Sequence, residues 1–154
     1  MTLRSLDTRR CRPGFTLIEM LVTVAMIAIL VGMAAPNVSR DITHSRVNGA
    51  AQIVAAELEK AVSLAGRQRR PLRVVVDGAA KEIRLVDRAS GQLISRRQFG
   101  AASEFKLYSV AGAPSTVDLL PQGTATTSAL ITVRAGNYSR RITMTRAGLV
   151  RVIP

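Results

Sequence analysis

Residues 9–19 read Arg-Arg-Cys-Arg-Pro-Gly-Phe-Thr-Leu-Ile-Glu, and the apolar run that begins at Phe15 continues to Ala35 with Glu19 as its only charge. At about 1.5 Å per residue, a helix over this run is roughly 30 Å long, which matches the hydrocarbon thickness of a bilayer. Arginines gather before the run, so the positive-inside rule places the N-terminus in the cytoplasm. The stretch predicts one transmembrane helix, with the rest of the chain across the membrane.

The acid inside this run needs a specific explanation. A carboxylate in an apolar span costs about 2.5–3.5 kcal/mol on insertion scales, so it usually has a partner. If the chain were cut after Gly14, the new α-amino group of Phe15 would lie one helical turn from Glu19. The amine of a neighbouring copy, shifted along the helix axis, could then pair with this carboxylate at low dielectric. Glu19 is therefore predicted to align subunits in a helical assembly.

Residues 12–22, Arg-Pro-Gly-Phe-Thr-Leu-Ile-Glu-Met-Leu-Val, resemble the prepilin signature of type IV pilins and type II secretion pseudopilins. The resemblance implies that a membrane-embedded prepilin peptidase cuts between Gly14 and Phe15 and then N-methylates Phe15. Pro36 matches a proline that is common at the end of the span in this family. The implied localisation is the bacterial inner membrane, with a single pass, a cytoplasmic N-terminus and a periplasmic C-terminal domain.

Three alternatives exist for this N-terminal region. A secretory signal peptide has a shorter, uncharged apolar core, and a cut after Ala35 would place Pro36 directly after the bond. A plain membrane anchor explains the span but not the position of Glu19. A lipoprotein would need an apolar segment before Cys11, where the sequence reads Asp-Thr-Arg-Arg. The prepilin interpretation is therefore favoured.

Length and composition limit what the chain can build. Its 154 residues suit an anchor and one small domain, and the presence of only 3 Phe, 2 Tyr and no Trp predicts an aliphatic core. Cys11 is the only cysteine, so removal of residues 1–14 would leave no disulfide. The net charge of +12 favours acidic partners, anionic lipid headgroups or nucleic acid, although a solvated arginine-rich surface is the simpler explanation.

Apolar periodicity predicts that the helix continues beyond the span. The residues that recur at three- and four-residue spacing are Val47, Ala50, Ala51, Val54, Leu58, Ala61 and Ala65. Gly66 suits a helix end, and Pro71 forbids continuation soon after it. We therefore predict one helix from residue 15 to about residue 64, whose second half packs on a globular domain.

Beyond the helix the pattern changes to that of short strands. The segments that alternate or are rich in β-formers are 72–76, 82–86, 93–95, 104–108, 116–120, 130–133, 140–144 and 149–153. Gly112-Ala113-Pro114 is expected to break the pattern between two of them. The predicted fold class is α+β, with a long N-terminal helix packed on an antiparallel sheet or sandwich. The predicted parts are a leader (1–14), a transmembrane and assembly helix (15–36), its amphipathic continuation (37–66) and an antiparallel β domain (67–154).

The C-terminal segment carries a second resemblance. Leu-Pro-Gln-Gly-Thr-Ala at 120–125, a strand, residues 137–145 and then Gly-Leu-Val-Arg-Val at 148–152 resemble the type II secretion pseudopilin H and FimT group. The resemblance implies a pilin-like fold and a minor pseudopilin of the pseudopilus that drives protein export across the outer membrane. The alternative is a type IV minor pilin of the FimT kind, involved in pilus assembly and DNA uptake. The implied partners are other pilins or pseudopilins, the prepilin peptidase and the inner-membrane assembly platform.

Arginines are the candidate nucleic-acid contacts, because guanidinium groups suit bidentate contacts with phosphate. FimT-like minor pilins can bind DNA through a Gly-Arg-x-Arg motif near the C-terminus. Residues 148–151 read Gly-Leu-Val-Arg here, so Leu149 replaces the first arginine of that motif. The candidate contacts in this sequence are Arg140, Arg141, Arg146 and Arg151.

No catalytic constellation is visible, and we predict that the chain is not an enzyme. The single His44 is expected to be solvated or at headgroup level, and a thiol–histidine nucleophile or a usual zinc site would need more ligands. The aspartates form no dense calcium-type loop, and there is no glycine-rich phosphate loop. No metal or cofactor is predicted. Gly14 and Phe15 are substrates of another enzyme.

Overall fold

The computed structural model describes residues 14–153, except for the side chains of residues 34–37, which include Pro36. The predicted leader lies outside the described residues apart from Gly14. The chain divides into two compact units, Met1–Val38 and Ser39–Pro154. One helix, α1 (Leu17–Gln68), begins in the first unit and ends in the second.

Helix α1 ends later than predicted. Gly66 lies inside the helix, and the left-handed residue that terminates it is Arg69, with φ of 51°. A Cβ added to Gly66 would lie 3.8 Å from the Cα of Gly123. Gly66 therefore lies in ordinary van der Waals contact with a loop, and the helix continues past it. This tertiary contact is not visible in the local pattern, which is why the predicted boundary was wrong.

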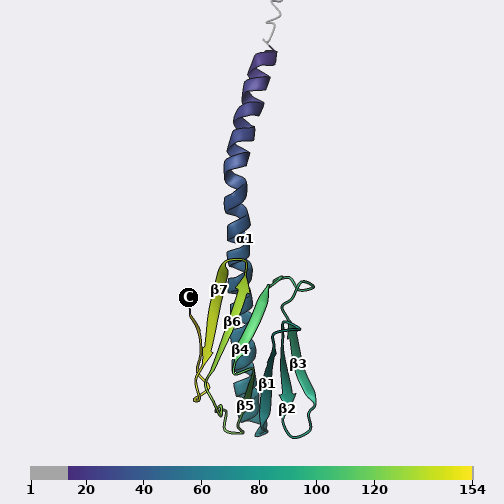
Figure 1. The fold of residues 1–154 in the computed structure, drawn as a ribbon, viewed down its shortest axis with the longest axis vertical. Coiled ribbons are helices and arrows are strands. Elements are labelled where there is room, and N and C mark those ends of the chain that lie inside the picture. Colours follow the sequence, from purple (N-terminus) through teal and green to yellow (C-terminus); the bar gives the residue numbers. More distant parts are fainter. Residues whose placement is uncertain (1–13, 154) are drawn as a thin grey trace, which may run out of the picture. The chain divides into compact units, whose positions relative to one another are not determined.

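The rest of the second unit is β structure (Figure 1). Its strands are β1 (Leu72–Asp77), β2 (Glu82–Asp87), β3 (Leu93–Gln98), β4 (Ser109–Ala113), β5 (Thr116–Leu119), β6 (Ala129–Ala135), β7 (Tyr138–Met144) and β8 (Val150–Ile153). They form two antiparallel four-stranded sheets. The first sheet has the order β3-β2-β1-β5, and the second sheet has the order β4-β6-β7-β8. The predicted α+β class, a long helix on antiparallel sheets, is confirmed.

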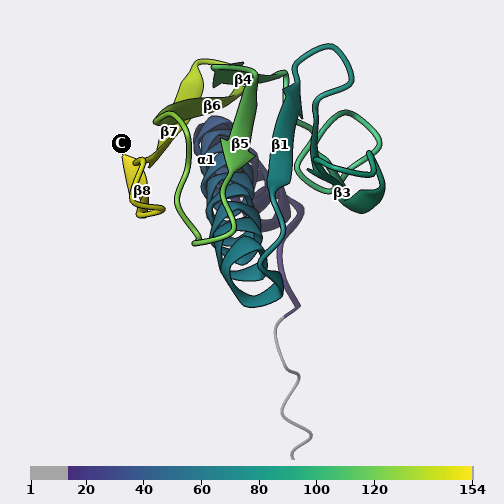
Figure 2. The same ribbon diagram turned by 90° about the horizontal axis from the view of Figure 1, so that it is seen from below.

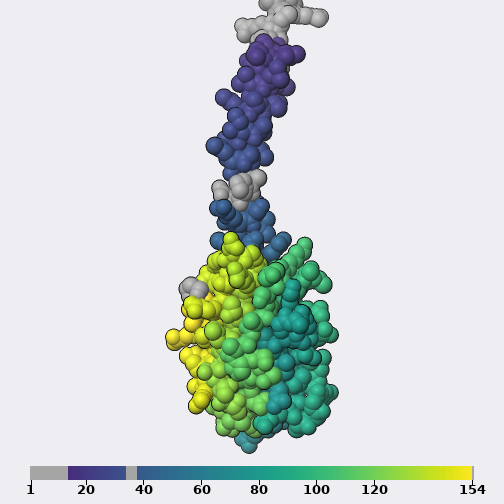
Figure 3. Space-filling view, viewed as in Figure 1, coloured from purple at the N-terminus to yellow at the C-terminus, as the bar shows by residue number. Residues whose placement is uncertain are grey.

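The two sheets meet where the chain passes from β4 to β5. The backbone N–H of Val76 in β1 donates a hydrogen bond to the carbonyl oxygen of Ser115 at 2.7 Å. A Cβ added to Gly112 in β4 would lie only 2.9 Å from the Cβ of Val76. Seen along the helix in Figure 2, the strands of both sheets arch over one side of α1. On the face shown in Figure 3, they form one continuous surface over the second half of the helix.

The strand predicted at 104–108 is wrong, since this segment is a turn and loop and the strand begins at Ser109. The alternation arose because the loop turns two apolar side chains inward. Leu107 is buried, and the rings of Phe105 and Phe99 lie 5.8 Å apart. Gly112, expected to break a strand, lies within β4, where its missing side chain permits the contact with β1.

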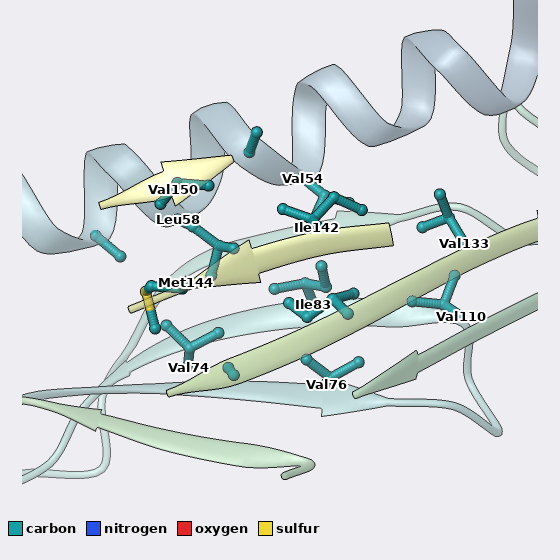
Figure 4. Close-up of a cluster of buried hydrophobic side chains, with 14 of the residues drawn as sticks. Val54, Leu58, Val74, Val76, Ile83, Val110, Val133, Ile142, Met144 and Val150 are labelled. Atoms are coloured by element: carbon teal, nitrogen blue, oxygen red, sulfur yellow. The ribbon is translucent and has the colours of Figure 1, made fainter. Parts of the chain in front are cut away.

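The core lies between α1 and the two sheets. The predicted stripe from Val47 to Ala65 is buried along its whole length. Figure 4 shows Val54 and Leu58 of the helix directed toward strand β7, which carries Ile142 and Met144. Burial of a Leu or Val side chain contributes about 1.5–3 kcal/mol, so this stripe fixes the second half of α1 to the sheets.

Candidate functional site

The segment before α1 is exposed. A Cβ added to Gly14 would meet no atom within 4 Å, and Phe15 is 83% exposed. The helix starts two residues later, at Leu17. The peptide bond between Gly14 and Phe15 therefore lies in accessible, non-helical chain, the form in which a peptidase can bind and cut a backbone.

Glu19 forms a reciprocal capping box with Thr16. The backbone N–H and the hydroxyl of Thr16 donate to Oε2 of Glu19 at 2.9 and 3.1 Å. In return, the backbone N–H of Glu19 donates to the hydroxyl of Thr16 at 3.2 Å. Two N–H groups that the first turn leaves without helical partners are satisfied in this way, and the carboxylate sits at the positive end of the helix dipole. Sequence reasoning missed Thr16, although its signal, Thr-x-x-Glu at 16–19, was present.

The first half of α1 exposes a continuous apolar surface. Among the described residues, α1 is the helix long and apolar enough to cross a membrane, and none of its most apolar window, with a mean hydropathy of 2.4, is buried in the protein. The exposed side chains include Leu17, Ile18, Met20, Leu21, Val22, Val24, Met26, Ile27, Ile29, Leu30, Val31 and Met33. An apolar surface of this extent marks a segment made for lipid or for other helices.

The first sheet holds its acids in ion pairs or hydrogen bonds. Arg73 donates to both carboxylate oxygens of Asp118 at 2.6 and 3.0 Å, and Arg88 lies 3.5 Å from the same group. The hydrogen bonds from Arg73 hold the pKa of Asp118 below its usual value, against the opposing effect of desolvation. Backbone N–H groups of the turn after β2 likewise lower the pKa of Asp87.

Glu82 is the most buried acid of this sheet, with 3% of its surface exposed. Arg96 approaches it to 2.6 Å from β3, and Arg84 approaches it to 3.3 Å from its own strand. Arg84 also lies 3.2 Å from Asp77. The arginines of the first sheet therefore serve the internal structure of the protein.

The second sheet differs, since its four strands contain no Asp or Glu. Strand alternation and register place Arg134, Arg141 and Arg151 on the outer face, one on each of β6, β7 and β8. Arg134 lies opposite Ser139, Arg141 lies two residues further along β7, and Arg151 lies opposite Thr143. The three arginines therefore follow a diagonal across the sheet.

The four predicted nucleic-acid contacts do not share one face. Arg141 and Arg151 lie together on the outer face, whereas Arg140 points to the helix side and donates to Oδ1 of Asn48 at 2.8 Å. Arg146 lies in the turn between β7 and β8, and its carbonyl oxygen accepts a hydrogen bond from the backbone N–H of Ala125. Arg134 was not among the four predicted contacts, although the alternation of β6 places it on the outer face.

His44 packs against the turn between β6 and β7. Its ring stacks on the ring of Tyr138 at a centroid distance of 4.1 Å. The guanidinium of Arg140 lies 5.3 Å from the centroid of the same Tyr138 ring. Within the described residues, no group of three His, Cys, Asp or Glu side chains is arranged to hold a metal ion. The described part of the chain thus presents an apolar helix surface, an arginine face and a cleft beside His44.

Comparisons with known proteins agree with this picture. Residues 9–35 match the prokaryotic N-terminal methylation motif. No curated protein sequence matches the chain. Among solved structures, the type IV minor pilin FimU of Pseudomonas aeruginosa strain PAO1 is 19% identical, with a TM-score of 0.59 over 72% of this chain and 90% of that chain. A second crystal form of FimU is 18% identical, with a TM-score of 0.56 over 70% and 93% of the two chains.

The minor pseudopilin EpsH from the type 2 secretion system of Vibrio cholerae is also similar. It is 16% identical, with a TM-score of 0.51 over 70% of this chain and 96% of that chain. At such identities the likeness concerns the fold, and it extends to both a minor pilin and a minor pseudopilin. This chain carries the prokaryotic N-terminal methylation motif of prepilins on the α+β fold of minor pilins and pseudopilins.

Proposed function

We propose that the protein is a minor pseudopilin, a structural subunit of a type II secretion pseudopilus and not an enzyme. A prepilin peptidase removes residues 1–14 and methylates Phe15, and residues 15–36 hold the subunit in the inner membrane with its β domain on the periplasmic side. The observation that carries the proposal is the exposed apolar surface of α1 between Leu17 and Met33, attached to a domain whose own core is complete.

The two halves of α1 suggest how such a subunit would work. The second half of α1 packs within its own domain, because its apolar stripe is buried against the sheets. The first half has no such partner within the described chain, and lipid covers it before assembly. Packing against the same segment of other subunits would replace lipid contacts by helix contacts, as association of transmembrane helices does. Other pilins or pseudopilins and the assembly platform of the inner membrane are therefore the proposed partners.

Glu19 would supply the register of this packing. Its described hydrogen bonds use Oε2, and they tie the carboxylate to the start of its own helix. A cleaved neighbour would bring the α-amino group of Phe15 to this carboxylate, and in an apolar bundle the two charges favour one axial offset over all others. The capping box holds the carboxylate of Glu19 at the start of its own helix. The ion pair would set the axial position of the neighbouring subunit.

The intact mass and N-terminal sequence of the membrane-extracted protein test processing. We expect a chain that starts at N-methylated Phe15, and Gly14→Ala should accumulate as the longer precursor. A wild-type chain that starts at Met1 would make the protein a simple anchored domain.

A pair of substitutions separates the two roles of Glu19. Glu19→Gln removes the charge, whereas Thr16→Ala removes a cap worth about 1 kcal/mol but keeps the carboxylate. We expect Glu19→Gln to reduce the subunit in sheared pseudopili at least tenfold and Thr16→Ala to have a small effect, measured by immunoblot against equal membrane levels. A small loss in both variants would mean that Glu19 acts only as a cap, because Gln can also accept the hydrogen bond from Thr16.

A second candidate function is that of a type IV minor pilin of the FimT kind, which contributes to pilus assembly and binds DNA during uptake. The outer face of the second sheet favours it, because Arg134, Arg141 and Arg151 are exposed on strands without acids. Arginines spaced along a diagonal can follow a phosphate backbone, and such binding weakens with salt.

Duplex binding by the full chain in detergent tests this candidate. The variant Arg141→Gln/Arg151→Gln is compared with Arg67→Gln/Arg70→Gln, which removes two exposed arginines near the end of α1. If the sheet face binds DNA, the first variant lowers the salt slope of log K by roughly two and the second leaves it unchanged. Absence of wild-type binding at low salt, or equal loss in both variants, would reject the candidate.

A further inference from the structure

A cleft of about 550 Å³ lies where the second unit begins. One wall is the stretch of α1 from Ser39 to His44, and the other is the turn between β6 and β7. The residues that line it are Ser39, Arg40, Thr43, His44, Gly136, Asn137 and Tyr138. None of the predicted cleavage residues and none of the three outer-face arginines lines the cleft, although Arg134 donates to the carbonyl oxygen of Gly136 at 3.1 Å.

The walls of the cleft are fixed before any ligand arrives. Tyr138 stacks on His44 at 4.1 Å, and its hydroxyl donates to Oδ1 of Asn48 at 3.3 Å. Arg140 donates to the same oxygen at 2.8 Å. Gly136, at the first position of the two-residue turn, has a φ of 57°, a conformation that favours glycine. Ring stacking and shared hydrogen bonds therefore hold the turn against the helix, and a bound group would meet a preorganised site.

The lining has the chemistry of a phosphate site. It offers the guanidinium of Arg40, the hydroxyl of Thr43 and the imidazole of His44, and it contains no Asp or Glu. The Thr43 hydroxyl donates to the backbone carbonyl oxygen of Ser39 at 3.0 Å in the structure, and a rotation of this hydroxyl would redirect it to a ligand. Guanidinium and hydroxyl groups without a competing acid bind phosphate oxygens in a directed way.

Chain length keeps this cleft close to the membrane. Arg40 lies five residues beyond Ala35, the last residue of the apolar run, so even a fully extended chain separates them by at most about 18 Å. In a helix the separation is about 7.5 Å, which is comparable to the depth of one headgroup layer. The cleft is therefore within reach of lipid phosphates if the apolar run spans the bilayer.

We propose that this cleft binds the phosphate headgroup of an anionic phospholipid. Arg40 contacts the phosphate, and the stacked rings of His44 and Tyr138 form the floor on which the glycerol rests. The proposal depends on the membrane span in the proposed function, but not on processing or filament assembly. Lipid capture at this position would hold the globular unit at the membrane surface while the subunit waits for a partner.

Native mass spectrometry of the delipidated full chain in a neutral detergent tests the proposal. Phosphatidylglycerol and phosphatidylcholine are titrated into the wild type, Arg40→Gln, Arg40→Lys and Arg46→Gln. Arg46→Gln is the matched control, because Arg46 is exposed on the same helix and does not line the cleft. The arginines of residues 1–14 are present in all four proteins, so any lipid binding by them does not affect the comparison.

We expect one phosphatidylglycerol to bind ahead of phosphatidylcholine. Arg40→Gln should weaken this first step about fivefold, Arg40→Lys should restore part of it, and Arg46→Gln should leave it unchanged. Equal weakening in Arg40→Gln and Arg46→Gln, or no preference for phosphatidylglycerol, would overturn the site. Binding of soluble glycerol 3-phosphate as tight as that of the lipid would identify a free-phosphate site and overturn the lipid assignment. None of these results depends on whether Glu19→Gln enters pseudopili.

Discussion

The two sheets use arginine in opposite ways. In the first sheet, Arg73, Arg84 and Arg96 bind acids of the same sheet, and Arg97 reaches Glu57 of α1 at 3.2 Å. The strands of the second sheet hold no acid, and three of their arginines lie on the outer face. Arginine therefore forms internal ion pairs in the first sheet and a basic surface on the second. The net charge of the chain alone could not distinguish these two uses.

The two uses of arginine also predict different effects of substitution. In the first sheet it should affect the stability of the fold, and in the second sheet it should affect contacts with partner molecules. Exposed ion pairs contribute about 0–1 kcal/mol, but a buried acid that loses a partner is a larger loss. The first sheet contains such an acid in Glu82. In the second sheet, the turn before β8 comes close to α1 at Gly148, which lies against the side chain of Val62.

The largest effect is expected at Gly148, in the turn that precedes β8. Its φ is 82°, and an added Cβ would lie 2.8 Å from the carbonyl oxygen of Gly123 and 2.9 Å from a methyl of Val62. Gly148→Ala should lower the free energy of unfolding by about 3 kcal/mol, from backbone strain and overpacking together.

The matched control for Gly148 comes from the first sheet. Gly91 has a φ of 71° with no atom within 4 Å of an added Cβ, so Gly91→Ala should lose only about 1 kcal/mol. Chemical denaturation of both variants measures the difference. Equal losses would show that the contact between the β7–β8 turn and the helix adds nothing to the stability of the second sheet.

The junction between the sheets should give the next effect. Gly112→Ala places a Cβ 2.9 Å from the Cβ of Val76 and 3.1 Å from the carbonyl oxygen of Pro114. We expect a loss of about 1–3 kcal/mol, since a branched side chain cannot move aside as a flexible one can. Hydrogen exchange should show faster exchange in both β1 and β4. Faster exchange confined to β4 would mean that the sheets unfold independently.

An arginine pair tests the comparison directly. Arg96→Gln leaves the buried Glu82 with a weaker set of partners and should cost about 1 kcal/mol. Arg151→Gln, on the outer face of the second sheet, should change stability by less than about 0.5 kcal/mol. Thermal unfolding of the two variants provides the measurement. A larger loss of stability in Arg151→Gln than in Arg96→Gln would show that the outer-face arginine, and not the ion-paired one, stabilises the fold.

The smallest effect expected is a local loss of stability at low pH. The pKa of Asp118 is lowered in the folded protein, while an unfolded Asp titrates near 3.9. The stabilisation from its pair with Arg73 is therefore complete above about pH 4 and is lost as the pH falls through the lowered folded value. Amides of β1 and β5 should lose protection before those of β6 and β7 as the solution is acidified. Asp118→Asn should remove this ordering, and its persistence in that variant would assign it to another group.

Periodicity predicted much of this molecule, because burial repeats along the chain. The stripe of α1 and seven of the strand segments follow from it, as does the class of fold. It failed at Gly66, where the helix continues past a glycine, and at Gly112, where the missing side chain permits a contact with β1. It also failed at 104–108, where a loop imitates the alternation of a strand.

The candidate sites show the same division. The exposed segment around Gly14, Phe15 and Glu19 could be located from local sequence, because its features lie within one turn of the helix start. The orientation of Arg140 toward Asn48 and the stacking of His44 on Tyr138 could not, since they join residues that are far apart in the chain. The cleft beside His44 joins residues 39–44 to residues 136–138, so its second wall could not be located from local sequence.

The capping box at Thr16 and Glu19 has a consequence for the leader. Because the helix closes its first turn with its own side chains, nothing upstream is needed to keep it wound. If residues 1–14 are removed as proposed, both residues of the capping box stay with the remaining chain. The proposed cut would then leave the first turn of α1 with its own hydrogen bonds, so the helix would not need to refold after processing.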